Sequence, residues 1–176
     1  MIDSLIKLVE SKIDEINTVA LGKITKVDLS KLRCNVKLKH KIQGNEIELF
    51  DVPVAVPKFH DSMIIVAPKE GDIVLVVFSK YELEEQLKNK DIVDVNELLK
   101  FNINNAIVIA GIYTAVDSIP EELDEECILI KHESGSYFKF DHEENVILQH
   151  KSGAYIKFDK NGNLEIKAKR VDFLKL

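Results

Sequence analysis

Four side chains, His132, His150, Cys34 and Cys127, are the first candidates for metal or thiol chemistry in this chain. The two histidines lie 18 positions apart, in phase with neighbouring apolar residues. If copies of the chain met about an axis, each histidine would form an interior ring of imidazoles able to hold water, an anion or a metal. The open alternative is that the strand end beside each histidine twists outward and leaves both in solvent. The cysteines are 93 positions apart and lack zinc-ligand spacing, so two buried free thiols are favoured over a disulfide.

A second group with possible chemistry is a run of carboxylates, formed by Glu121, Glu122, Asp124, Glu125 and Glu126. These residues lack the alternating spacing of a calcium-binding loop. The sequence also offers no Ser–His–Asp or Cys–His arrangement and no Gly-rich phosphate loop in a convincing context. It therefore predicts no enzyme, no cofactor and no metal centre.

The net charge of the 176-residue chain is −6, and it is unevenly distributed. Residues 117–127 contain six acidic residues and no basic one, whereas residues 128–176 carry a net charge of +2. Without a large basic field, specific binding of nucleic acid is not expected. Binding of single strands would also need exposed aromatic residues, and Phe50, Phe59 and Phe78 stand in apolar contexts that predict a core.

Hydropathy limits the location of the protein. The longest apolar run is Ile73–Phe78, six residues, whereas a membrane-spanning helix needs about 20. The N-terminus mixes charged with apolar residues and lacks a small-residue cleavage site, so no secretory signal is predicted and synthesis in the cytoplasm is expected.

The first element is a predicted helix within residues 1–19. Apolar residues recur at spacings of four and three, at Ile2, Ile6, Val9, Ile13, Ile16 and Ala20. This heptad stripe, with isoleucine at both seam positions, favours a three-stranded coiled coil. A helix that lies on its own domain explains the stripe equally well.

Residues 20–116 are predicted to form a small β-barrel. Short β-branched segments bounded by turn residues predict strands at Leu21–Val27, Cys34–Leu38, Glu46–Val54, Ile64–Ala67, Ile73–Phe78 and Ala106–Tyr113. Gln43-Gly44-Asn45 predicts a hairpin turn, and Pro68–Asp72 predicts another turn. Tyr81–Lys90 has helical propensity. Five or six strands with one helical insertion indicate an oligonucleotide/oligosaccharide-binding (OB) fold.

The acidic segment, residues 117–127, is predicted to be a linker, and an internal repeat of 18 residues follows it at 128–176. Ile128–Asp141 aligns with Val146–Asp159, and a degenerate third copy begins at Leu164 and includes Leu174 and Leu176. Each unit is predicted to be two short strands around a turn that contains Ser-Gly or a similar pair. Apolar residues occupy even-numbered positions and lysines occupy odd ones, which predicts strands with one apolar face.

Short hairpins with one apolar face cannot bury that face alone. Self-association would close the sheet edges and create one core, for which a three-chain prism is the simplest arrangement. The predicted core of this shaft comprises Ile130, Phe140, Leu148, Phe158 and Ile166. The alternative is that the repeats fold back onto residues 20–116.

Several motifs, taken together, resemble phage baseplate assembly protein V, the membrane-piercing central tail spike family of contractile injection systems. The barrel contains Asp51-Val52-Pro53-Val54, similar to the Val-Pro-Val step of the family. Ala67–Ser79 is similar to its Pro-x-x-Gly-Asp turn and the apolar strand that follows. Asn105–Ile112 is similar to its Asp-Ala-x-x-x-x-Gly-Leu segment, and the Ser-Gly repeats at Gly135 and Gly153 resemble its β-helical shaft.

The resemblance implies a mainly β protein: an OB-fold barrel followed by an intertwined, trimeric triple-stranded β-helix. It implies a structural component of a phage, bacteriocin or injection-machine baseplate, assembled into the virion or particle. The implied partners are the tail tube or hub, other baseplate proteins and the target cell envelope. Related spikes end in a His-x-His pair that holds iron, but no histidine follows His150, so a separate tip-capping protein is expected. The alternative is that the last residues cross over and close the end of the shaft themselves, with Leu174 and Leu176. The alternative function is an OB-fold protein that binds nucleic acid or carbohydrate and carries a trimerising tail.

Overall fold

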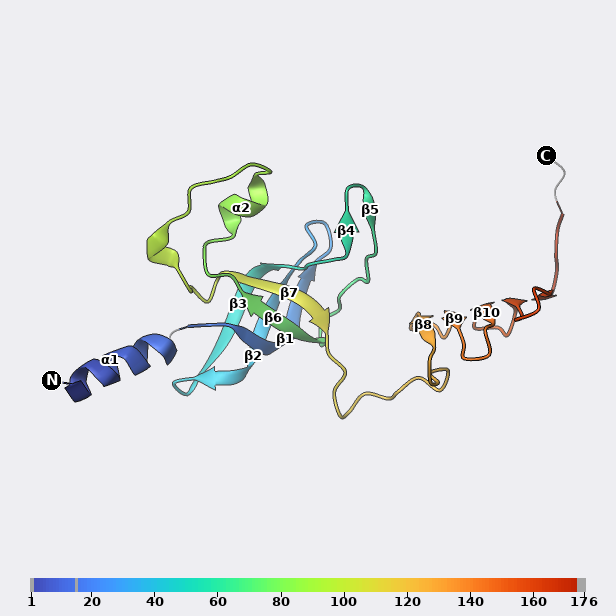
Figure 1. Cartoon of the computed structure of the whole chain (residues 1–176), viewed down its shortest axis with the longest axis horizontal. Helices are drawn as coiled ribbons and strands as arrows, with labels where there is room; N and C mark the ends of the chain where they lie inside the picture. The colour runs from blue at the N-terminus through green and yellow to red at the C-terminus, as the bar shows by residue number, and fades with distance from the viewer. Residues whose placement is uncertain (1, 15, 174–176) are drawn as a thin grey trace. The chain divides into compact units, whose positions relative to one another are not determined.

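The computed structural model describes residues 2–14 and 16–173, and the chain divides into two units, Met1–Ala115 and Val116–Leu176 (Figure 1). Strands make up 40% of the chain and helices 10%, and the sheets are antiparallel. The predicted mainly β class with a short N-terminal helix is therefore confirmed.

The N-terminal helix α1 spans Ile2–Asp14 and ends earlier than the sequence predicts. Its seam residues Ile2, Ile6, Val9 and Ile13 are all exposed. The heptad stripe thus faces solvent in the single chain, and no strand of the same unit buries it.

Five strands of the N-terminal unit form one sheet in the order β3-β2-β1-β6-β7. They are β1 (Val19–Asp28), β2 (Arg33–Ile42), β3 (Asn45–Pro53), β6 (Ile73–Phe78) and β7 (Ala106–Gly111). Directly after β3, Val54 pairs in parallel with Val108 of β7, and the amide of Ala55 donates to the Val108 carbonyl at 2.7 Å. The two outer strands of the sheet therefore meet, and the sheet curls around a core.

Alternating strand residues build this core. Ile24, Val36, Leu49, Val76 and Val108 are almost completely buried. The β2–β3 hairpin turns at Gln43 and Gly44, which have φ angles of +50° and +81°. Two left-handed residues match the twist of the flanking strands, so the predicted hairpin turn is confirmed.

The predicted strand Ile64–Ala67 is wrong. The residues that pair here come earlier, in a short hairpin of β4 (Lys58–Phe59) and β5 (Ser62–Met63). Ile64 and Val66 are exposed, and the β4–β5 ladder ends with the Lys58–Met63 pair, beyond which the Ile64 amide makes one hydrogen bond to the Pro57 carbonyl, at 3.0 Å. The predicted helical stretch Tyr81–Lys90 contains a shorter helix, α2 (Glu84–Lys88), and a 3₁₀ turn follows at Glu97–Leu99.

The predicted core positions of Phe50 and Phe59 are also wrong, since 68% and 86% of these residues is exposed. The ladder between β2 and β3 is irregular: Val36 pairs with Leu49, whereas Cys34 pairs with Val52. This bulge turns both Leu49 and Val52 inward, so Phe50 faces outward. Phe59 lies in the small β4–β5 hairpin, and only Phe78 packs against the core.

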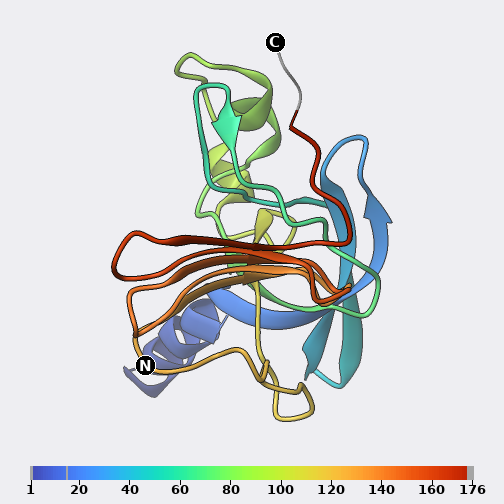
Figure 2. The same cartoon turned by 90° about the vertical axis from the view of Figure 1, so that its right-hand side faces the viewer.

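The C-terminal unit is a five-stranded meander in which each strand pairs with the next (Figure 2). The strands are β8 (Ile128–Lys131), β9 (Tyr137–Phe140), β10 (Val146–Gln149), β11 (Tyr155–Phe158) and β12 (Leu164–Lys167). Equivalent residues of the 18-residue repeat occupy equivalent places, in β8 and β10 and in β9 and β11. Leu174 and Leu176 of the predicted third copy lie outside the described residues.

Candidate assembly interface

The even-numbered residues of the C-terminal sheet form two apolar rows that cross all five strands. Strand register aligns Ile130, Phe138, Leu148, Ile156 and Ile166 in one row. The second row contains Ile128, Phe140, Val146, Phe158 and Leu164. The two rows together are called the apolar face below. All five residues of the predicted shaft core, Ile130, Phe140, Leu148, Phe158 and Ile166, lie on it.

The apolar face is open to solvent in the single chain. Ile128 and Ile130 are exposed by 62% and 64%, and Leu148 by 54%. The rings of Phe138 and Phe140 contact each other edge to face, with centroids 4.9 Å apart, yet Phe140 remains exposed. Monomeric proteins seldom expose so many contiguous large apolar side chains, and such patches mark interaction surfaces.

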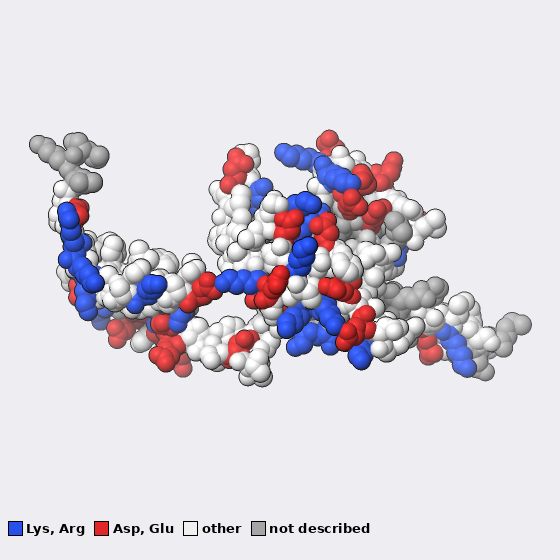
Figure 3. All heavy atoms as spheres, turned by 180° about the vertical axis from the view of Figure 1, so that it is seen from behind, with Lys and Arg blue, Asp and Glu red and all other residues white. Residues whose placement is uncertain are grey.

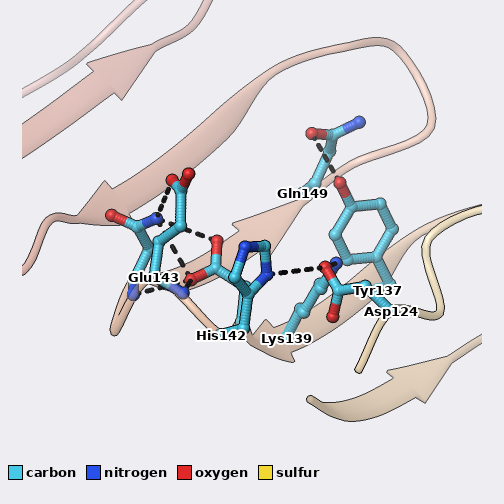
Figure 4. Close-up of polar contacts among 8 residues, drawn as sticks. Asp124, Tyr137, Lys139, His142, Glu143 and Gln149 are labelled. Atoms are coloured by element: carbon cyan, nitrogen blue, oxygen red, sulfur yellow. Dashed lines mark hydrogen bonds and ion pairs between the residues drawn. The ribbon is translucent and has the colours of Figure 1, made fainter. Parts of the chain in front are cut away.

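The opposite face carries polar pairs that involve the odd-numbered residues (Figure 4). The Tyr137 hydroxyl donates to Gln149 Oε1 at 3.0 Å. Lys139 Nζ lies 2.6 Å from Asp124 Oδ2, and His142 Nδ1 lies 3.6 Å from the same oxygen. The two faces of one sheet therefore differ in chemistry as the alternation predicts.

The acidic segment packs against the sheet that follows it. Glu122 pairs with Lys131 of β8, and Asp124 pairs with Lys139 of β9. The hydrogen bond from Lys139 lowers the pKa of Asp124, and the same contact raises the pKa of Lys139. The sequence predicts a linker here. The sequence does show six acidic residues followed by lysines at odd-numbered positions. This pattern predicts ion pairs only when it is already known which residues face the polar side of the sheet.

His132 and His150 lie in equivalent turns and are both exposed. The amide of Ser134 donates to His132 Nδ1 at 3.1 Å, and the amide of Ser152 donates to His150 Nδ1 at 3.3 Å. In each turn the neighbouring serine hydroxyl also lies 2.9 Å from the ring nitrogen. Nδ1 of each histidine thus serves the turn in which it lies.

The turns at the opposite ends of the strands use aspartate in the same way. Asp141 Oδ1 accepts from the amides of Glu143 and Asn145, and Asp159 Oδ1 accepts from those of Asn161 and Asn163. Side-chain acceptors of this kind stabilise tight turns. The repeat therefore specifies the turns at both ends of its strands as well as the two faces of the sheet.

The N-terminal unit contains a separate polar hollow that the sequence did not predict. It is lined by Arg33, Phe50, Asp51, Glu82 and Asn104, among others. Arg33 Nη1 donates to the carbonyl of Asp51 at 2.7 Å and to its Oδ2 at 2.9 Å. Asp51 has φ +53°, a conformation that non-glycine residues seldom adopt. No sequence pattern indicates this hollow, because four separate segments form it, at residue 33, 50–53, 82–87 and 102–106.

Among residues 2–14 and 16–173, no three His, Cys, Asp or Glu side chains converge as metal ligands would. Cys34 and Cys127 are both free thiols, and Cys34 is buried as predicted, whereas Cys127 is only partly buried. Within the part of the chain that the structure describes, no helix has the length and apolar character required to cross a bilayer. On the face shown in Figure 3, basic and acidic side chains of the N-terminal unit are intermingled.

No protein-family model matches this chain, and no curated protein matches it either.

Proposed function

We propose that the chain assembles into a homotrimer through the apolar face of its C-terminal sheet. The observation that carries this proposal is the set of exposed large side chains on one face: Ile128, Ile130, Phe140, Leu148, Ile156, Phe158, Leu164 and Ile166. Full burial of one such side chain contributes about 1.5–3 kcal/mol. These side chains are 41–64% exposed in the single chain, so each would gain about half of that value on assembly, and eight per chain would offset much of an association cost of about 4–15 kcal/mol.

Three copies are the simplest closed arrangement for this sheet. Three one-layer sheets around an axis enclose a single narrow core. No further layer is then needed to cover the sheet, including its edge strands β8 and β12. The heptad stripe of α1, exposed on Ile2, Ile6, Val9 and Ile13, supports the same symmetry. Around that axis, His132 and His150 would each be present in three copies at one level.

The trimer would serve as the central spike of a contractile phage tail or of a related bacteriocin or injection particle. The motifs at 51–54, 67–79 and 105–112 and the Ser-Gly repeats support this role through their resemblance to baseplate assembly protein V. The strand order of the N-terminal sheet, with the parallel contact between Val54 and Val108, supports an OB-type barrel. The spike would sit beneath the tail tube, carry a separate tip protein and pierce the target cell envelope on sheath contraction.

Light scattering on the purified chain tests the assembly directly. The expected mass is three times the 20.0 kDa of the chain, independent of dilution over the micromolar range. A monomer at neutral pH would refute the trimer. Labelling of native particles with antibodies against the chain, followed by electron microscopy, then tests the spike. Labelling at the baseplate centre is expected, and its absence from particles would refute that role.

A second candidate function has one observation in its favour. Phe50 and Phe59 are exposed, and Phe50 lines the polar hollow beside Arg33 and Asp51. An aromatic ring beside paired donors and acceptors suits a nucleobase or a sugar. Fluorescence anisotropy with labelled oligonucleotides and oligosaccharides tests it. Binding that is lost in Phe50→Ala would favour this function, and a trimer with no affinity for either ligand would exclude it.

A further inference from the structure

The site at which the C-terminal sheet contacts Asp124 of the acidic segment occurs a second time in the 18-residue repeat, with basic residues at the equivalent positions. In the first repeat, Lys139 donates a hydrogen bond to Asp124, and His142 Nδ1 lies 3.6 Å from the same carboxylate oxygen. An offset of 18 residues places Lys157 at the position of Lys139 and Lys160 at the position of His142. Both pairs consist of a residue in a strand and a residue in the Asp–Asn turn that follows.

The first repeat shows how such a pair binds a carboxylate. Lys139 Nζ and His142 Nδ1 both point toward Asp124 Oδ2, and only 11% of the Lys139 side chain is exposed (Figure 4). The ligand reaches them on a short peptide segment that crosses the polar face of the sheet. A carboxylate held by a charged donor at 2.6 Å makes a strong, charge-assisted hydrogen bond.

In the second repeat the corresponding cations have no such ligand. Within residues 2–14 and 16–173, no carboxylate forms an ion pair with Lys157 or Lys160. Glu165 lies opposite Lys157 in the register of β11 and β12, but its carboxylate accepts from the Tyr155 hydroxyl. Lys167 of β12 adds a further positive charge, with Nζ 5.9 Å from the centre of the Tyr155 ring.

The acidic segment of the same chain is already engaged elsewhere. Its Glu122 and Asp124 pair with Lys131 and Lys139, and β8 begins at Ile128, directly after the segment. Glu122 and Asp124 are therefore not available to Lys157 and Lys160.

We propose that Lys157 and Lys160 bind a carboxylate on an acidic peptide segment of a partner protein, as Lys139 and His142 bind Asp124. The partner segment has adjacent Asp or Glu residues and crosses the polar face at β11. A peptide is favoured over a lipid or free phosphate because the equivalent site in the first repeat holds a peptide carboxylate. This inference concerns the polar face and does not depend on the proposed trimer, which uses the apolar face.

A peptide that copies residues 116–127, with Ser in place of Cys127 and a fluorescent label, is the probe for this site. The full-length chain should bind it. The double variant Lys157→Glu/Lys160→Glu should lose about tenfold or more of this affinity. The matched control is Lys151→Glu/Lys169→Glu, which makes the same change in charge within the same unit and should keep the affinity. A probe with Asn and Gln in place of its acids should not bind.

Three outcomes would overturn the proposal. The first is no binding of the probe by the wild-type chain with both lysines intact. The second is equal weakening in both double variants, which would indicate unspecific charge attraction. The third is tighter binding to phosphatidylglycerol vesicles than to the probe through the same two lysines, which would indicate a lipid surface. Circular dichroism of each variant shows that the sheet is still folded.

Discussion

At the scale of single residues, the two Asp–Asn turns form a natural experiment on backbone strain. Glu144 has φ +65°, and its repeat equivalent Gly162 has φ +81°. No atom lies within 4 Å of a side chain added at Gly162, so only backbone strain opposes a substitution there. A left-handed conformation costs a non-glycine residue about 1–2 kcal/mol.

Gly162→Ala should therefore lower the unfolding free energy of the C-terminal sheet by about 1 kcal/mol. Glu144→Gly should raise it by a smaller amount. Glycine relieves the backbone strain at this position, but part of that gain is offset because the unfolded chain becomes more flexible. Thermal melting followed by circular dichroism measures both changes. Equal melting temperatures for Gly162→Ala and wild type would contradict the assigned turn conformation.

The two thiols should differ sharply in reactivity. Cys34 is buried in the barrel core, and burial raises the pKa of its thiol to about 11. The thiolate is the reactive form, so Cys34 should not react with maleimide or iodoacetamide near pH 8 in the folded protein. Mass spectrometry should find label on Cys127 alone before denaturation and on both residues after it. Rapid native labelling of Cys34 would show that the barrel opens.

At the scale of elements, the polar turns and the acidic segment should make the C-terminal sheet sensitive to acid. The hydrogen bond from the Asn163 side chain lowers the pKa of Asp159 from its ordinary 3.8. Lys139 likewise lowers the pKa of Asp124. A carboxyl whose pKa is lower in the folded state stabilises that state above the unfolded pKa. This stabilisation is lost as the pH falls through the folded value.

The melting temperature should therefore be constant near neutral pH and should fall below about pH 4. Asp159→Asn keeps an oxygen that accepts hydrogen bonds but does not titrate, so its melting temperature should fall less steeply with acid. Differential scanning calorimetry at several pH values gives both slopes. Identical slopes for the variant and wild type would remove Asp159 from the acid response.

The strands that could be predicted are those whose pattern alone defines a face. Val74 and Val76 alternate within an apolar run and are buried, and the strand Ile73–Phe78 is confirmed to the residue. Ile64–Ala67 has the same local character, but the ladder between β4 and β5 ends at Met63, and a strand needs a partner that its own sequence does not specify. Phe50 escapes prediction because a bulge shifts the alternation.

The apolar face was predicted because its residues repeat at even positions over the whole C-terminal unit. The polar hollow and the contacts of the acidic segment were not predicted, since they depend on residues brought together from separate segments. Arg33, Asp51 and Asn104, for example, line one hollow although no spacing in the sequence relates them.

At the scale of the whole molecule, charges placed on the apolar face should prevent assembly. Phe140→Asp or Phe158→Asp would bring three unpaired carboxylates to one axis, at a cost of several kcal/mol each. Light scattering should then show monomers or aggregates. The control Gln149→Glu adds the same charge on the opposite face and should leave the trimer intact. Wild-type melting and mass in Phe140→Asp would contradict burial of this face.

The two units should also be separable. All residues of the barrel core lie between Ala20 and Val108, so a chain without residues 117–176 has its complete core. The truncated chain should be folded, with strand-type circular dichroism and a cooperative thermal transition. An insoluble or unfolded product would show that the barrel depends on the C-terminal unit.

The meander of β8 to β12 has a consequence for how the length of this unit can change. Each strand pairs only with the strands before and after it, and the pattern recurs every 18 residues. Strands in a sheet lie about 4.8 Å apart, so one unit of two strands spans about 10 Å. Duplication or loss of one unit in the gene leaves every remaining pairing unchanged. The length of this sheet, measured across its strands, can therefore change during evolution in equal steps of one 18-residue unit.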